Sequence, residues 1–344
     1  MKKLIFNILI FSLVSLTGYS QTGGDNVYEF LNLTHSAYIS ATGGGNVSVF
    51  NNDINLAAHN PGLLNSEMDK SLTLDYVNYF AGINYGMAMY GRSFEGTGNF
   101  GAGITYLNYG SFTEADEAGN ITGSFTASEY AFSIIYSRSI DSLFHIGATV
   151  KPVLSHLEKY TSFGMAFDLG ASYHSRNNLF SAGVVLRNIG LELTTYAGEE
   201  KMPLPFEIQA GVSQKLAHAP FRASLTLRHL EKFDLTYQYY TPQSATETPP
   251  PDPGFGENLL RHMIFGLELI PHKNFYLAGG YNYQRRSELK VSSKGSSVGL
   301  SWGFGIKTSF IDIEFGRATY HLAGASNHMT LIFRPGLIYR KGSE

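Results

Sequence analysis

A few residues in this sequence have the types and spacing found in enzymes that catalyse acyl transfer. Ser287-Glu288-Leu289-Lys290 has the spacing in which a lysine activates a serine nucleophile, and Lys307-Thr308-Ser309 follows it. That chemistry requires a helix, which places the lysine one turn after the serine. Because these residues fall in an expected loop between strands, chance explains the match better, and we expect no enzyme.

Residues that could bind a metal or a phosphate are also isolated. The 11 histidines are scattered, with His218 and His229 near opposite ends of one expected strand, and no zinc-binding spacing occurs. The glycine-rich stretch "GTGNFGAG" at 96–103 precedes a strand and not the helix N-terminus that binds phosphate. We therefore expect no metal and no cofactor.

Three basic residues form the remaining candidate site. Arg285, Arg286 and Lys290 lie beside Glu288 in an expected exterior loop. They could bind lipopolysaccharide phosphate or an acidic patch of a partner, because guanidinium and ammonium groups bind such oxygens. Charges that neutralise one another in a solvated loop are the simpler interpretation.

The composition excludes several classes of protein. Of the 344 residues 43% are hydrophobic, 14% aromatic and only 15% charged, whereas about 25% charged is usual for soluble domains. The net charge of −3 is spread without a basic run, so nothing indicates nucleic-acid binding. There is no cysteine, which suits a large sheet protein better than a disulfide-stapled domain.

Residues 1–20 have the features of an export signal. Lys2 and Lys3 precede an apolar stretch at 4–16 and a cleavage site of small residues before Gln21. After residue 20, no stretch of the sequence has the run of about 20 apolar residues that a membrane-spanning helix needs. We expect an exported protein without a helical span.

From residue 70 onward, large apolar residues alternate with small or polar ones, as in "SSVGLSWGFGIKTSFIDIEFG" at 296–316. A period of two indicates strands. Most segments have about 9 to 13 residues, close to what a tilted strand needs to cross a bilayer. About fourteen strands, an even number, predict an all-β, closed antiparallel transmembrane barrel. The expected strands are 70–79, 83–92, 99–109, 126–138, 143–157, 162–174, 179–188, 205–216, 220–230, 260–270, 275–284, 298–307, 310–320 and 327–334.

The connections alternate between short and long, as in outer-membrane barrels with tight periplasmic turns and longer exterior loops. Segment 233–240 has strand character, but counting it would make the strand number odd, so we place it in a loop. The proline-rich stretch 241–257 is interpreted as an exterior loop rather than a recognition peptide. The long connections are 110–125, 189–204, 231–259 and 285–297.

The strands have one apolar and one mixed-charge face. In a soluble sandwich the charged face would meet water, whereas in a membrane barrel the apolar face meets lipid. Strand length and low charge favour the barrel. Five polar residues expected in the lumen could line a pathway or hold an internal segment by ion pairs: Asp168, Arg187, Arg222, Glu268 and Asp312.

Residues 21–69 differ from the barrel that is expected at 70–334. They combine apolar side chains with Gly43-Gly44-Gly45 and an Asn60-Pro61-Gly62 turn. A barrel of this size is wider than its own side chains can fill. We expect this segment to be a plug, with a periplasmic cap as the alternative, and residues 335–344 to be a C-terminal tail.

Several stretches resemble the FadL-like outer-membrane barrels of Bacteroidetes, and within them the PorQ family of the type IX secretion system, a relative of PorV. The quoted stretches are "SAYISATGGGNVSVFNNDINLAAHNPGLL" (36–64), "GGDNVYEFLNL" (23–33), "LRNIG" (186–190), "LPFEIQAGVSQKLAHAPFR" (204–222), "HLEKFDL" (229–235), "MIFGLEL" (263–269) and "LAGGYNYQRRSEL" (277–289).

This resemblance implies an outer-membrane, non-enzymatic component of an attachment complex. Its partners would be a PorZ-like surface protein, which it anchors, a PorU-like sortase and a PorV-like barrel, with contact to outer-membrane lipid and lipopolysaccharide. One departure is the ending "RPGLIYRKGSE" after Phe333, where barrels usually stop at an aromatic residue. The alternatives are a FadL-like channel for hydrophobic small molecules and a soluble secreted lectin-like protein.

Overall fold

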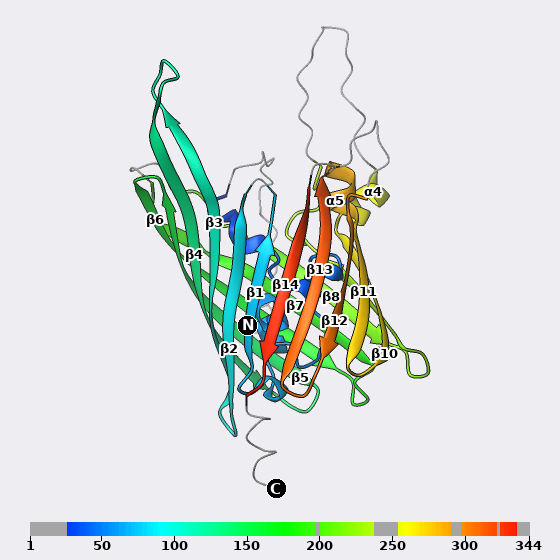
Figure 1. Ribbon diagram of the computed structural model, residues 1–344. Helices are drawn as coiled ribbons and strands as arrows, with labels where there is room; N and C mark the ends of the chain where they lie inside the picture. The colour runs from blue at the N-terminus through cyan, green and yellow to red at the C-terminus, as the bar shows by residue number, and fades with distance from the viewer. Residues whose placement is uncertain are drawn as a thin grey trace, which may run out of the picture.

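The alternating segments form strands that close into a barrel (Figure 1). The structure is a computed structural model that describes residues 26–80, 82–196, 200–236, 254–289, 297–321 and 324–335. Fourteen antiparallel strands pair in chain order, which confirms the predicted fold. The strands are β1 (Leu72–Asn78), β2 (Asn84–Phe94), β3 (Gly98–Ala115), β4 (Ile121–Ser139), β5 (Phe144–Leu157), β6 (Tyr160–His174), β7 (Phe180–Thr194), β8 (Glu207–Lys215), β9 (Phe221–Leu227), β10 (Met263–His272), β11 (Phe275–Asn282), β12 (Leu300–Lys307), β13 (Ile311–His321) and β14 (Gly324–Phe333).

The first and last strands close the barrel. β1 pairs with β14 from Leu72↔Phe333 to Asn78↔Asn327, and with β2 along the same length. No strand edge is therefore left open around the wall. In hydrocarbon, which cannot form hydrogen bonds, this closure is what a sheet requires.

The two faces of the wall differ as the sequence predicts. The outward face carries large apolar side chains, such as Trp302, which is 53% exposed. The inward face carries buried polar ones, such as Glu207 and Asp312. Val298 is an exception: it continues the apolar alternation in the sequence but is buried, and it lies before the start of β12 at Leu300. Further exposed apolar residues of the outer wall are Phe132, Ile134, Ile146, Val150, Phe167, Leu169, Val212, Phe265, Leu267 and Ile313.

The two ends of the barrel are unlike. The start of β1 and the end of β14 lie at one end, the lower end in Figure 1, together with short turns such as 140–143 and 308–310. The upper end carries the hairpin of β3 and β4 and two helices, α4 (Phe255–Arg261) and α5 (Tyr283–Leu289). Among the described residues, no helix has the length and hydropathy to cross a bilayer.

The hairpin of β3 and β4 corrects one expected loop. Residues 110–125 were expected to be a loop, but β3 and β4 remain paired from Ser111↔Thr126 to Glu114↔Gly123. Across this ribbon the rings of Phe112 and Phe125 stack with centroids 5.2 Å apart. Such cross-strand aromatic pairs stabilise a two-stranded ribbon, so the strands continue beyond the barrel. We call residues 111–126 the β3–β4 arm.

The upper helices correct two further expectations. Residues 285–297 were expected to be a loop and residue 260 the start of a strand, whereas 285–289 belong to α5 and residue 260 to α4. Ser287 therefore lies in a helix, where its hydroxyl donates to the carbonyl of Gln284 at 3.0 Å. Lys290 lies outside the described residues, as do the expected signal peptide, residues 237–253 and the tail from 336 onward.

Placing a charge on the outer wall tests its contact with lipid. We expect Leu169→Arg to lower the free energy of unfolding in lipid vesicles by about 2–4 kcal/mol, because a charged side chain is costly near the midplane of a bilayer. Denaturant titration of folded and unfolded bands in a semi-native gel measures this. Leu230→Arg, at an exposed position outside the strands, is the control, and an equal loss in both variants contradicts the assignment.

Candidate functional site: the N-terminal segment inside the barrel

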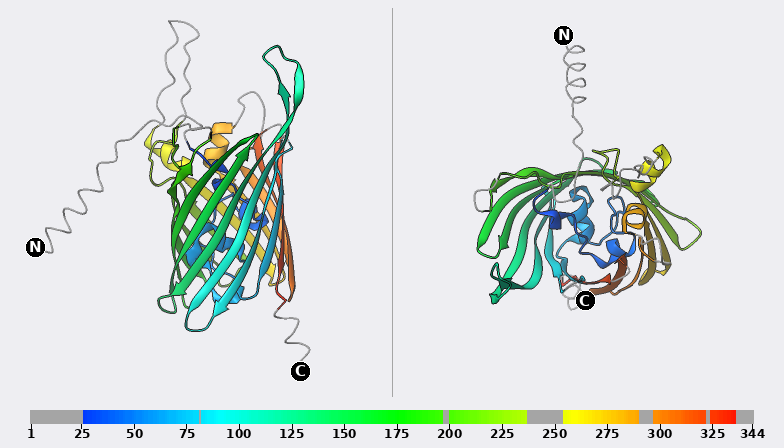
Figure 2. Two further views of the ribbon diagram at one scale, coloured as in Figure 1. Left: turned by 90° about the vertical axis from the view of Figure 1, so that its left-hand side faces the viewer. Right: turned by 90° about the horizontal axis from the view of Figure 1, so that it is seen from above.

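Residues 26–69, here called the N-terminal segment, lie inside the ring of strands (Figure 2). The segment begins near the upper end, where the amide of Val27 donates to the carbonyl of Pro203 at 3.0 Å. It reaches the lower end where the amide of Lys70 donates to Gly91, at 2.9 Å. Its helices are η1 (Glu29–Asn32), α2 (Ala37–Ala41), α3 (Asn55–His59), η2 (Pro61–Leu63) and η3 (Ser66–Met68).

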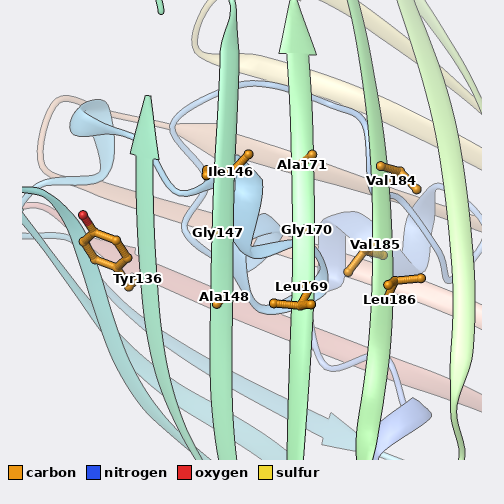
Figure 3. A pocket seen from close by; sticks show the side chains of 10 residues that line it. All are labelled: Tyr136, Ile146, Gly147, Ala148, Leu169, Gly170, Ala171, Val184, Val185 and Leu186. Atoms are coloured by element: carbon orange, nitrogen blue, oxygen red, sulfur yellow. The ribbon is translucent and has the colours of Figure 1, made fainter. Parts of the chain in front are cut away.

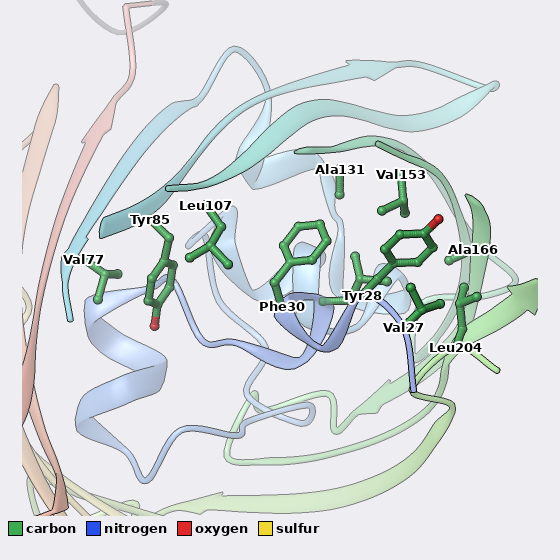
Figure 4. Close-up of a cluster of buried hydrophobic side chains, with 11 residues drawn as sticks. Val27, Tyr28, Phe30, Val77, Tyr85, Leu107, Ala131, Val153, Ala166 and Leu204 are labelled. Carbon is green, nitrogen blue, oxygen red and sulfur yellow. The ribbon is translucent and has the colours of Figure 1, made fainter. Parts of the chain in front are cut away.

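The upper part of the segment is held by apolar packing (Figure 4). Tyr28 and Phe30 point toward inward-facing side chains of the wall, including Leu107 and Val153. The Tyr28 hydroxyl also forms a hydrogen bond with Ser162 of β6. Burial raises the pKa of this phenol to about 12, so it remains protonated and able to donate.

Gly43 and Gly44 end α2 and turn the chain. The amide of Gly44 donates to the carbonyl of Ile39 at 2.9 Å and that of Gly43 to Ser40 at 3.1 Å, which is a Schellman motif. Gly43 has φ +109°, a conformation that side chains disfavour. A Cβ on Gly43 would lie 2.3 Å from Ile264 of the wall, and one on Gly45 3.0 Å from the same side chain.

The Asn60-Pro61-Gly62 turn sits directly on the wall backbone. Asn60 donates its side-chain amide to the carbonyls of Val47 (2.8 Å) and Ala171 (3.2 Å), and Ser172 donates to the carbonyl of Gly62 at 2.6 Å. The contact is possible because three strands present glycines here. We call these residues the glycine cradle: Gly147, Gly170 and Gly183. A Cβ added to any of them would lie only 1.9–2.3 Å from an atom of the N-terminal segment.

A β-bulge creates the first polar network. The pairing of β6 and β7 shifts between Phe167 and Leu169, and Asn188 has φ +56°. The backbone N–H of Asn188 donates to the carboxylate of Asp168 at 2.8 Å. Because of the bulge, Arg187 and Asn188 are both buried although they are consecutive.

This network connects the wall to the N-terminal segment. Lys151 forms an ion pair with Asp168 at 2.7 Å and donates to Asn188 at 2.6 Å. Asn188 donates to the side chain of Asn32, and Arg187 donates to the carbonyl of Leu31, both at 3.0 Å. The charged groups of the wall thus hold η1 in place.

A second network holds α2. The hydroxyl of Tyr38 donates to Glu268 at 2.7 Å, and Arg222 forms an ion pair with the same carboxylate at 3.2 Å. Two further ion pairs do not involve the N-terminal segment: Arg334 with Asp312 at 2.7 Å, and Arg228 with Glu207 through two hydrogen bonds of 2.6 and 2.8 Å.

The structure therefore brings together only some of the residues singled out in the sequence. Arg222 and Glu268 form a pair, whereas Asp168 and Arg187 belong to one network without pairing, and Asp312 lies in a separate pair. The sequence analysis missed Lys151, Asn188 and the glycine cradle. Alternation along β5 already places the side chain of Lys151 inside the barrel, so the sequence could have identified it. The bulge that turns Asn188 inward has no such signal in the sequence.

The basic residues near the upper end contact their own chain. The guanidinium of Arg285 lies 3.9 Å from the centroid of the Tyr320 ring, and Arg286 donates to the carbonyl of Val298 at 3.4 Å. Their role in partner binding remains a prediction. Within the described ranges, no group of three or more His, Asp or Glu side chains could hold a metal ion.

Comparisons with known proteins relate the fold to a class of membrane barrels. No protein-family profile and no curated protein matches the chain. Two structures of the toluene transporter TodX from Pseudomonas putida match with a TM-score of 0.51, at 11% and 12% identity, over 87% and 88% of this chain and 96% and 97% of theirs. A Pseudomonas aeruginosa FadL homologue matches over 88% of this chain and 98% of its own at 11% identity, with a TM-score of 0.49. At such identities the likeness establishes the fold and not the function.

The glycine cradle yields a test of the contact with the Asn60-Pro61-Gly62 turn. We expect Gly170→Ala to destabilise the protein by about 1–3 kcal/mol, because its Cβ would lie 2.1 Å from the Asn60 side chain. Gly279→Ala, where the nearest atom is 4.0 Å away, is the matched control. Thermal unfolding in detergent compares them, and equal midpoints contradict the close contact.

The ion pair at α2 gives a second test. We expect Arg222→Met to cost about 3–5 kcal/mol, because it leaves the buried Glu268 carboxylate without its cation. Adding Glu268→Gln should recover most of this loss, since the amide oxygen still accepts from Tyr38 while the charge is gone. Chemical denaturation of both variants measures the difference. No recovery in the double variant would contradict this explanation.

Proposed function

We propose that this protein is a non-enzymatic outer-membrane component of a type IX secretion attachment complex that anchors a PorZ-like surface protein. The proposal joins the closed barrel to the resemblance of the sequence to the PorQ family. The complex would also contain a PorU-like sortase and a PorV-like barrel. The short turns of the lower end would face the periplasm and the upper end the cell exterior, as is usual for such barrels.

The observation that carries the proposal is how the N-terminal segment is held. α2 and η1 are bound to the wall through buried charged groups, among them Glu268 and Arg187. A hydrophobic solute passing along the lumen would have to displace these helices. It would leave those charges in an apolar environment, which is costly. This arrangement supports a platform more than an apolar conduit.

The β3–β4 arm supplies a surface for the partner. β2 pairs with β3 only as far as Asn108, and β5 pairs with β4 only from Ala127. Both edges of the arm therefore expose backbone groups to which another strand can pair. The arm carries Glu114, Asp116 and Glu117 and no basic residue.

These charges favour a protein partner with a basic docking strand. The acidic arm repels both a second copy of itself and the anionic surface of lipopolysaccharide. Ile121, 76% exposed, and the Phe112 ring provide an apolar contact beside the charges. A strand with alternating basic and apolar residues would complement both the acidic charges and the exposed apolar side chains of the arm.

A channel for hydrophobic small molecules is the second candidate function. An apolar groove of about 500 Å³ lies on the wall over β4 to β7 (Figure 3), and Gly147 and Gly170 of the glycine cradle are among the residues that line it. Together with the likeness to the fold of TodX, it favours a path through the wall. Against this path, β5 and β6 are paired without interruption beneath the groove, from Ile146↔Ala171 to Val150↔Phe167.

Removing the arm tests the anchoring function. We expect replacement of residues 112–125 by a two-residue Asn-Gly turn to leave a folded barrel in the outer membrane, because the strands below remain paired. The PorZ-like protein should then appear in the medium and no longer co-purify with the barrel. Glu114→Lys with Glu117→Lys should weaken co-purification without shortening the arm.

The outcomes separate the two parts of the proposal. If the wild-type barrel retains no PorZ-like protein, the anchoring function is wrong. If the partner stays bound without the arm, anchoring stands and only the docking surface is wrong. Faster uptake of a hydrophobic solute by vesicles with the wild-type barrel than by empty vesicles would favour the channel.

A further inference from the structure

A small cavity lies between the N-terminal segment and the inner wall. Its volume is about 30 Å³, room for one or two particles the size of a water molecule. Its lining is about half polar, and five polar side chains from the segment and four strands contribute to it: His35, Thr105, Ser133, Lys151 and Arg187.

The cavity adjoins a buried positive charge that has no ion-pair partner. Arg187 is only 5% exposed, and its Nε has no hydrogen-bond partner. Within the described part of the chain, no carboxylate lies within 4.0 Å of its guanidinium. The two nearby inward acids are already engaged: Asp168 by Lys151 at 2.7 Å and Glu207 by Arg228 at 2.6 Å. A buried cation that no carboxylate contacts directly is energetically unfavourable.

His35 also lines this space. Burial and the nearby charge of Arg187 lower the pKa of His35 to about 3, so the ring is neutral near pH 7. A neutral imidazole carries one N–H, and a serine or threonine hydroxyl can turn its O–H toward an acceptor. The polar lining can therefore donate several hydrogen bonds to one small acceptor.

We propose that this cavity binds a single monatomic anion, chloride in ordinary salt, against the guanidinium of Arg187. A water molecule would fill the space without neutralising the charge, whereas polyatomic anions such as sulfate exceed the volume. Arg187 also donates to the carbonyl of Leu31 at 3.0 Å. The ion would thus stabilise the point at which the N-terminal segment meets the wall. This inference does not depend on the anchoring function.

Anion-dependent unfolding of the purified full chain tests the proposal. At constant ionic strength, we expect the unfolding midpoint to rise as chloride replaces gluconate, because an ion bound only by the folded state stabilises it. Ser133→Val should reduce the apparent chloride affinity at least tenfold by filling the cavity while leaving Arg187 in place. Ser137→Val, a buried serine on the same face of β4, should leave it unchanged. Arg187→Gln should abolish the dependence.

Crystals grown in bromide give an independent readout. We expect an anomalous difference peak in the cavity beside the guanidinium of Arg187, which would support the proposal even if Arg187→Gln fails to fold. Coincident chloride and gluconate curves for the wild type, or crystals grown in bromide that lack such a peak, would mean that the cavity holds water only and would overturn the proposal. A chloride effect that Ser133→Val leaves intact would likewise overturn it, because the ion would then bind elsewhere.

Discussion

The structure depends on one constraint, which is that a wall surrounded by hydrocarbon must satisfy its own backbone hydrogen bonds. A sheet meets this constraint only when its edges pair with each other. The pairing of β1 with β14, from Leu72↔Phe333 to Asn78↔Asn327, completes that closure. The outward side chains then need no polar partner, which explains why the chain is only 15% charged.

Closure has a consequence for the interior. Fourteen strands enclose more space than their inward side chains fill, and the inward face is polar. A segment placed there must satisfy buried polar groups as well as fill volume. The N-terminal segment does both: Tyr38 donates to the carboxylate of Glu268, and the Asn60-Pro61-Gly62 turn lies against strands that present glycine instead of a side chain. The same polar interior buries the cation of Arg187, which donates to the carbonyl of Leu31 in the N-terminal segment.

The sequence was sufficient to predict the fold because alternation is a local property that each strand carries by itself. Fourteen strands and their outward faces could therefore be read from the pattern. The candidate site was less accessible, because it depends on register between distant segments. Nothing local shows that Gly170 lies against Asn60, or that a bulge turns Asn188 toward Lys151. The length of the β3–β4 arm was missed for a similar reason, since cross-strand stacking of Phe112 and Phe125 extends it.

The single tryptophan of the chain offers the most direct test of the central claim that the apolar face meets lipid. Trp302 projects from β12 on the outer wall and is 53% exposed. In vesicles, its fluorescence should be quenched strongly by lipids brominated on their acyl chains and hardly at all by iodide in the buffer. Quenching by iodide with no effect of the brominated lipids would place this face in water and contradict the account.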